Sequence, residues 1–267
     1  MGRLEDRFRE LELKGERALI CYLMVGYPDY DLSLKAFRTV LENGADILEI
    51  GFPFSDPVAD GPTIQVAHEV ALKNGVRLRD VLRLSEDLRT DFPEIPFLLM
   101  AYYNPIFRMG LDRFCGVCAD AGIDGLIVPD LPPEECGELR RTAERRGLSV
   151  VLLASPTSTE ERLRKIATHS DEMVYFVSVT GTTGAREELP LKRIEEKVRF
   201  LKDLGRRVVV GFGVSKREHA RRISSFADGV VVGSLLVKIT AEGNIEKLSS
   251  TVRELKGGTI IKDSQGG

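Results

Sequence analysis

The chain has 267 residues and is 43% hydrophobic, which is enough for a large core and excludes a disordered protein as the default. The formal net charge of -3, from 38 Lys and Arg against 41 Asp and Glu, argues against a nucleic-acid or membrane surface as the main partner. The first residues lack the apolar stretch of a signal peptide, and no run is long enough to span a bilayer. We therefore expect a cytoplasmic protein.

The four cysteines fit that compartment, because their spacing is not that of a secreted disulfide framework. Cys115 and Cys118 form a CxxC pair, but a redox or metal site needs a second pair or a nearby histidine, and neither is present. We expect inert core cysteines on one face of a helix.

Short apolar runs alternate with helical patterns along the whole chain. Eight runs are predicted strands, and several are continuous rather than alternating, as in a parallel sheet that is covered by helices. They are Ala18–Val25, Ile47–Gly51, Phe97–Ala101, Gly125–Pro129, Ser149–Ala154, Met173–Ser178, Arg207–Phe212 and Gly229–Val232. Between them, apolar residues recur at helical spacing, as in the stripe of Leu191, Ile194, Val198, Leu201 and Leu204.

Eight strands that alternate with helices predict a (β/α)8 TIM barrel of one domain, residues 1–267, with a doubly wound open sheet as the alternative. An extra amphipathic helix precedes the first strand, with Leu4, Phe8 and Leu11 at helical spacing, and we expect it to plug the floor of the barrel. The polar tail, residues 262–267, is expected to be frayed.

Glu49 is the most informative residue of the chain. It stands among Ile47, Leu48 and Ile50 in a predicted buried strand, where an unpaired carboxylate is costly. Strand alternation places Ile47 and Glu49 on one face, so Glu49 points into the barrel mouth if Leu48 and Ile50 meet the outer helices. Residues 39–72 contain no Arg or Lys, so a local ion-pair partner is lacking and a functional carboxyl is favoured.

The loop that follows, Phe52–Pro62, carries two further acids, Asp56 and Asp60, and three prolines that stiffen it. Each aspartate suits a turn that caps the helix beginning near Thr63, and each also suits proton chemistry opposite Glu49. Position in the loop leaves both interpretations open.

Three glycine-rich turns follow late strands. They are Gly181–Gly184, Gly211-Phe212-Gly213 and Gly233-Ser234, the last of which opens a short helix, Leu235–Ile239. Backbone N–H groups in such turns, together with a helix N-terminus, form an anion site, and the loops after strands seven and eight are the recurrent phosphate site of a barrel. One such turn is weak, but three in these places favour a phosphate-bearing substrate.

Other residues at the predicted barrel mouth suggest a lid and an apolar pocket. The polar segment after Gly184 resembles a mobile lid over the sixth strand, with Thr183 as its candidate functional hydroxyl. Tyr102 follows the third strand and Tyr175 alternates inward on the sixth, and aromatic rings at a barrel mouth can floor an apolar pocket.

Several common chemistries lack their residues. The three histidines, His68, His169 and His219, fall in helical segments away from the predicted strand ends, and without an HxH pattern we expect no metal site. No lysine stands in a predicted strand core, so a Schiff-base aldolase lacks its nucleophile. A Rossmann GxGxxG motif is also absent from the sequence.

The stretch from Glu49 to Gln65 closely resembles the signature of the tryptophan synthase alpha chain family. Further blocks keep the family's order over nearly the whole chain, at Tyr102–Pro105, Val128–Pro132, Gly181–Gly184, Gly211–Ser215 and Gly233-Ser234. The resemblance implies a lyase of tryptophan biosynthesis. It would cleave indole-3-glycerol phosphate to indole and glyceraldehyde 3-phosphate by a retro-aldol reaction, without a metal or a cofactor in this chain.

By this resemblance, Glu49 matches the acid–base residue that protonates the indole ring and then takes a proton from the glycerol hydroxyl. Asp60 matches the acceptor of the indole N–H, Tyr175 matches a hydroxyl near that chemistry, and Thr183 matches the lid threonine that closes onto Asp60. The phosphate-binding pattern falls on Gly184, Gly213, Gly233 and Ser234. The pocket for the indole is expected from Tyr22, Met100, Tyr102, Phe212 and Val232.

The family's beta chain carries pyridoxal phosphate and converts indole and serine to tryptophan, so the resemblance implies an alpha2-beta2 assembly. The interface positions of the family fall on Pro53, Asp56, Asn104 and Pro132. The sixth loop lacks the arginine that bacterial members often have, and Leu235 replaces the usual alanine, so lid positioning and signalling to the partner can differ here.

Other functions remain to be weighed against this one. A stand-alone indole-releasing lyase and a non-catalytic activator of a beta chain are the alternatives, although intact Glu49 and Asp60 argue against the activator. Indole-glycerol-phosphate synthase and phosphoribosylanthranilate isomerase should carry a catalytic Lys, or a Cys and Asp pair, at strand ends, and this sequence does not.

Overall fold

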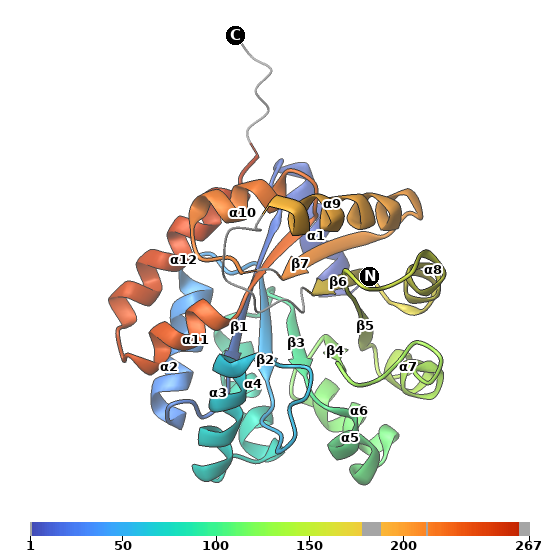
Figure 1. Cartoon of the computed structure of the whole chain (residues 1–267). Coiled ribbons are helices and arrows are strands. Elements are labelled where there is room, and N and C mark those ends of the chain that lie inside the picture. The colour runs from blue at the N-terminus through green and yellow to red at the C-terminus, as the bar shows by residue number, and fades with distance from the viewer. Residues whose placement is uncertain (1, 178–187, 212, 262–267) are drawn as a thin grey trace.

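The computed structural model describes residues 2–177, 188–211 and 213–261. Its strands form a closed parallel barrel in the order β1 to β8, with helices around it (Figure 1). The strands are β1 Ala18–Met24, β2 Ile47–Gly51, β3 Phe97–Met100, β4 Gly125–Ile127, β5 Ser149–Ala154, β6 Met173–Val177, β7 Arg207–Gly211 and β8 Gly229–Val232. Because β8 pairs with β1, the barrel prediction is confirmed and the open sheet is not.

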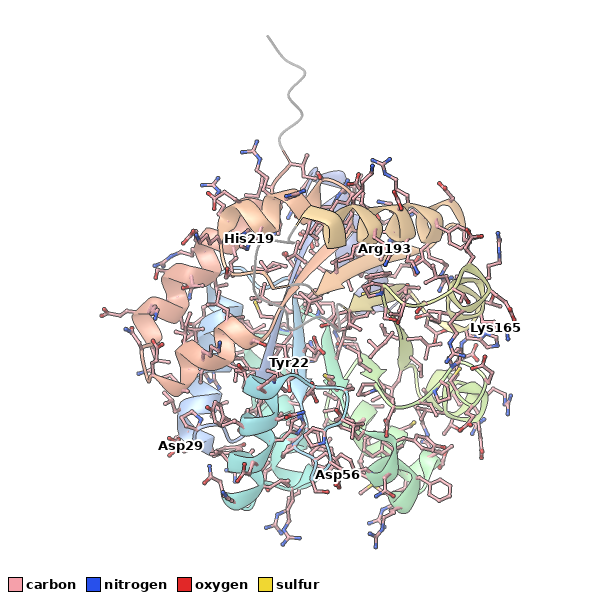
Figure 2. The ribbon with its side chains drawn as sticks, viewed as in Figure 1. Tyr22, Asp29, Asp56, Lys165, Arg193 and His219 are labelled. Carbon is pink, nitrogen blue, oxygen red and sulfur yellow. The ribbon has the colours of Figure 1, made fainter. Side chains whose placement is uncertain are left out.

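The helices precede, connect and follow the strands. They are α1 Arg3–Leu13, α2 Tyr30–Glu42, α3 Pro62–Lys73, α4 Leu78–Asp91, α5 Tyr103–Met109, α6 Leu111–Asp120, α7 Gly137–Glu144, α8 Glu160–His169, α9 Glu188–Asp203, α10 Arg217–Ser224, α11 Ser234–Ala241 and α12 Ile245–Thr259. Charged side chains such as Lys165 on α8 and Arg193 on α9 lie on the outside of this ring (Figure 2), which accounts for the scattered basic residues.

All eight predicted strands coincide with observed ones, and the differences lie at their carboxyl ends. β1 and β3 end one residue before the predicted boundary, and β4 ends two residues before Pro129, whose ring nitrogen cannot donate to a ladder. The predicted last residues of β6 and β7, Ser178 and Phe212, lie outside the described residues.

Strand alternation divides the core into two apolar clusters. Leu48 and Ile50 pack in the larger cluster, between the strands and the helices, whereas Ile47 packs inside the barrel. The interior cluster also contains Leu4, Phe8 and Leu11 of α1. The N-terminal helix therefore closes the floor of the barrel, as expected from its spacing.

Four aspartates brace the strands in pairs at the floor of the barrel. Each stands just before an even-numbered strand, accepts a backbone N–H of the preceding odd-numbered strand at 2.8 to 2.9 Å, and pairs with a basic side chain from a helix. The amide of each aspartate bonds back to the same strand residue. The four sets of aspartate, strand residue and base are Asp46, Leu19 and Lys256; Asp124, Phe97 and Arg89; Asp171, Val150 and Arg140; and Asp228, Val208 and Lys202.

The cysteines are buried free thiols, and Cys115 and Cys118 lie on the same face of α6 in the core. Burial raises the pKa of both thiols. Thiols that are buried and protonated are poor nucleophiles, which agrees with the expected packing role.

Candidate active site

Glu49 is buried near the carboxyl end of β2, with 1% of its surface exposed. Neither carboxyl oxygen has a hydrogen-bond partner among the described residues. Burial, and to a lesser extent the charge of Asp60, raises the pKa of Glu49 to about 8. The carboxyl group therefore holds a proton at neutral pH. No described group accepts a hydrogen bond from it.

Two tyrosines face the same region from other strands. Tyr22 lies opposite Glu49 in the β1–β2 register and toward the middle of the barrel (Figure 2), and its hydroxyl is buried without a described partner. Tyr175 lies on β6. Burial raises the pKa of both phenols well above the usual value, and the Glu49 and Asp60 charges add to this, so both hydroxyls stay protonated.

Two glycines make room for these rings. A Cβ at Gly51 would lie 2.5 Å from the Tyr22 hydroxyl, and a Cβ at Gly211 would lie 2.9 Å from the Tyr175 ring. The sequence pattern places Gly211 in the glycine-rich turn that ends the seventh strand, and it is the last residue of β7. Its lack of a side chain leaves room for the Tyr175 ring.

Asp60 is held by two side chains at the end of the β2–α3 loop. Its Oδ2 atom accepts a hydrogen bond from the Tyr102 hydroxyl at 2.8 Å, and Nε2 of His68 lies 3.1 Å from the same oxygen. The residue before α3 is Gly61, and no side chain from the described residues caps this helix. Helix capping, the alternative left open for Asp56 and Asp60, is therefore not what either residue does.

The predicted phosphate-binding positions that can be described lie after β7 and β8. Gly233 is the N-cap of α11, which starts at Ser234, and no described side chain caps that helix. Its first backbone N–H groups therefore suit an anion. Gly213 has a φ of 43°, in the left-handed region that favours glycine. Thr183, Gly184 and Phe212 lie outside the described residues.

Three of the residues predicted for the indole pocket stand at or just after strand ends. Met100 is the last residue of β3 and contacts both core clusters, while Tyr102 is the N-cap residue of α5. Val232 ends β8 and packs in the larger cluster, whereas its neighbour Val231 packs inside the barrel, so strand alternation turns Val232 toward the helices.

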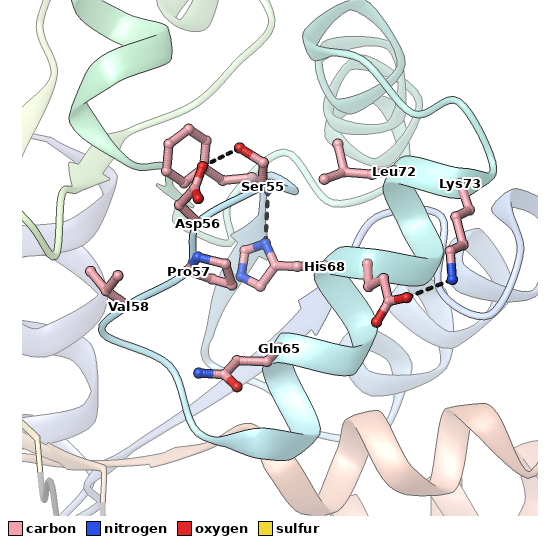
Figure 3. Close-up of a pocket in the computed structure, with 10 residues that line it drawn as sticks. Ser55, Asp56, Pro57, Val58, Gln65, His68, Leu72 and Lys73 are labelled. Carbon is pink, nitrogen blue, oxygen red and sulfur yellow. Dashed lines mark hydrogen bonds and ion pairs between the residues drawn. The ribbon is translucent and has the colours of Figure 1, made fainter.

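The four predicted interface positions differ in exposure. Asp56 and Asn104 are exposed and Pro132 is half-buried, but Pro53 is buried, so its side chain does not reach the surface of this chain. Asp56 lines a surface pocket of about 700 Å³ between the β2–α3 loop and α3 (Figure 3). Glu49 is not among the residues that line this pocket.

His68 is the residue that the sequence pattern missed. The helical pattern places it away from the site, yet its ring reaches back from α3 to Asp60 and to the backbone of Phe54. His68 follows Asp60 by eight residues, with the start of α3 between them. That spacing does not predict a contact, because the contact depends on how the loop folds against α3.

Two features are absent from the described ranges 2–177, 188–211 and 213–261. No helix there is long and apolar enough to cross a membrane. No group of three or more His, Cys, Asp or Glu side chains there is placed to hold a metal ion.

Comparison with known proteins gives one family. The model of the "Tryptophan synthase alpha chain" family matches residues 8–261. The tryptophan synthase alpha chain of Aquifex aeolicus is 66% identical over 97% of this chain and 99% of its own length, and that of Methanosarcina mazei is 42% identical over 97% and 94%.

Solved structures agree with this result. A structure from Aquifex aeolicus superposes with a TM-score of 0.92 at 62% identity, covering 98% of this chain and 100% of its own. A structure of Mycobacterium tuberculosis tryptophan synthase superposes with a TM-score of 0.90 at 39% identity, covering 98% and 99%. This chain therefore belongs to the tryptophan synthase alpha chain family, the lyase subunits of an enzyme of tryptophan biosynthesis.

Proposed function

We propose that this chain cleaves indole-3-glycerol phosphate to indole and glyceraldehyde 3-phosphate in the cytoplasm, with Glu49 as the acid–base group. One observation carries the proposal. The Glu49 carboxyl is buried at the barrel mouth without a described partner, and its pKa is about 8. A carboxyl group with that pKa holds a proton to donate near neutral pH and is a strong enough base to recover one.

The reaction needs two proton transfers that cancel. Glu49 gives its proton to C3 of the indole ring, which leaves positive charge on the ring and on its nitrogen. The Glu49 carboxylate then takes the proton of the hydroxyl on the adjoining glycerol carbon. As that carbon becomes a carbonyl, its bond to C3 breaks, and the electron pair restores the aromatic ring. Indole and the aldehyde leave, and Glu49 is again protonated.

The other residues hold charge and position the substrate. Asp60 accepts the indole N–H and stabilises the positive charge that develops there. The hydroxyls of Tyr22 and Tyr175 bind polar atoms of the substrate, which gives the buried, unpaired Tyr22 hydroxyl a partner. The turns at Gly213 and Gly233-Ser234 bind the phosphate with backbone N–H groups.

Membership of the family implies a beta chain partner. We further propose an alpha2-beta2 assembly in which pyridoxal phosphate is held by the beta chain. The loops at the barrel mouth offer a surface for the beta chain, since Asp56 and Asn104 are exposed. Two apolar side chains near them, Val58 and Phe107, are 82% and 66% exposed, which suits an interface more than free solvent.

Indole production from indole-3-glycerol phosphate, measured with and without a tryptophan synthase beta chain, tests the proposal. Indole release by the chain alone, increased by the beta chain, is the expected result. Equal release in both arms would indicate a stand-alone lyase. No release in either arm, with activation of the beta chain reaction, would indicate a non-catalytic activator and overturn the proposal.

A further inference from the structure

His68 joins the two ends of the β2–α3 loop. The side chain is 3% exposed and comes from the second turn of α3. Its Nδ1 atom accepts a hydrogen bond from the backbone N–H of Phe54 at 2.9 Å (Figure 3), and its Nε2 atom lies 3.1 Å from Oδ2 of Asp60. One imidazole ring therefore contacts the start of the loop and its catalytic end.

These contacts determine which nitrogen carries the proton. A ring nitrogen that accepts a hydrogen bond has no proton of its own, so a neutral ring that accepts at Nδ1 carries its proton on Nε2. His68 is then a donor to Asp60. This assignment follows from the hydrogen-bond network, as histidine tautomers do.

Tyr102 closes the network on the other side. Its hydroxyl accepts from the Ala59 amide at 3.1 Å and donates to Asp60, and its ring stacks on Phe54 with centroids 4.9 Å apart. Both donors to Asp60 reach Oδ2, and no hydrogen bond from the described residues reaches Oδ1. One oxygen is anchored while the other remains for a ligand.

The donors to Asp60 are neutral, and this matters for the proposed reaction. In the described part of the chain, no Lys or Arg forms an ion pair with Asp60. A cation at this place would hold the carboxylate equally well, but it would cancel part of the negative charge that acts on the indole nitrogen. Neutral donors fix the direction of a carboxylate and leave its charge in place.

We propose that His68 is a positioning residue for Asp60: its Nε2–H orients the carboxylate that receives the indole N–H, while its Nδ1 ties that carboxylate to the backbone of Phe54. This inference rests on the proposed function. It adds a role that resides in the second turn of α3, outside the strand that carries Glu49 and the loop that carries Asp60.

Two amide variants separate the two contacts of the ring, because each carries a polar atom near the place of only one ring nitrogen. The amide oxygen of His68→Asn lies near the place of Nδ1 and keeps the bond to Phe54, but the side chain is too short to reach Asp60. The amide nitrogen of His68→Gln lies near the place of Nε2 and donates to Asp60, but the bond to Phe54 is lost. Steady-state indole release from indole-3-glycerol phosphate gives kcat and KM for both variants, and urea unfolding gives their stability.

A positioning role predicts a specific split. In His68→Asn, kcat falls about tenfold, as for loss of one hydrogen bond to a charged group, while KM changes less than about threefold. In His68→Gln, kcat stays within about threefold of the wild type, whatever its stability. Equal losses of kcat in the two variants, or unchanged kcat in His68→Asn, would overturn the proposal and assign His68 to loop packing alone.

The tautomer can be measured without any substitution. Nitrogen-15 chemical shifts of the His68 ring at about pH 8 should show a proton on Nε2 and none on Nδ1, and the reverse pattern overturns the proposal. The wild-type assay separates this inference from the function on which it rests. Absence of indole from wild-type protein rejects both, whereas wild-type release with an Nδ1–H ring rejects only the role of His68.

Discussion

Replacing Glu49 by Gln should change the pH dependence of stability as well as the activity. In the folded chain the pKa of Glu49 is about 8, and its ordinary value is 4.5. Because the folded-state pKa is raised, the contribution of this group is fully present below pH 4.5 and is lost as pH rises towards 8. Each unit in that window weakens the folded state by about 1.4 kcal/mol, so roughly 3 kcal/mol is lost by about pH 7.

The amide that Glu49→Gln introduces does not titrate, and it keeps the size of the side chain and its lack of partners. The difference in unfolding free energy between this variant and wild type should therefore grow from about pH 5 to about pH 8 and then level off. Urea unfolding of both proteins at unit pH steps measures this difference. Adding Asp60→Asn should move the levelling point to lower pH, because the Asp60 charge contributes to the shift. A difference that stays constant from about pH 5 to about pH 9 would show that Glu49 is ionised in the folded chain and would refute the reasoning.

Three further changes test the site and its supports. Tyr22→Phe removes a buried hydroxyl without a described partner, so it should stabilise the chain by about 1 kcal/mol in urea unfolding and raise KM in the indole assay; a loss of stability would contradict this. Gly211→Ala places a Cβ 2.9 Å from the Tyr175 ring, so kcat should fall about tenfold with a stability loss of about 1 to 3 kcal/mol, and unchanged kcat would remove Tyr175 from the chemistry. Asp46→Ala leaves a β1 amide without its carboxylate acceptor, while Lys256 keeps Glu16 as a partner, so it should lower the unfolding free energy by about 1 to 3 kcal/mol, against less than about 0.5 kcal/mol for the exposed control Asp56→Ala; equal effects of the two would show that the brace adds nothing.

The barrel could be predicted because its signals are local. Continuous apolar runs of strand length and helical stripes between them depend only on neighbouring residues, and both recur in the structure at the expected places. Glu49 stood out for the same reason, since a carboxyl group inside an apolar run needs an explanation wherever that strand lies. Its burial and orientation follow directly from strand alternation.

The support of the site could not be predicted, because it depends on contacts between distant segments. His68 and Asp60 meet only because the loop folds back against α3, and Tyr102 joins them from the end of β3. In the sequence, Gly211 belongs to a glycine-rich turn that suggests phosphate binding. Only the structure shows that the Tyr175 ring lies beside Gly211. Similarly, the unpaired hydroxyl of Tyr22 is visible only once its described neighbours have been placed.

The most direct test of the account is a comparison of indole release from indole-3-glycerol phosphate by wild type and by Glu49→Gln, with binding of the substrate measured in parallel. The account predicts that the wild type releases indole and that the variant binds the substrate with similar affinity but releases none above background. Release by Glu49→Gln within about tenfold of the wild-type rate would contradict it, because a buried amide cannot supply the proton that carbon–carbon cleavage requires.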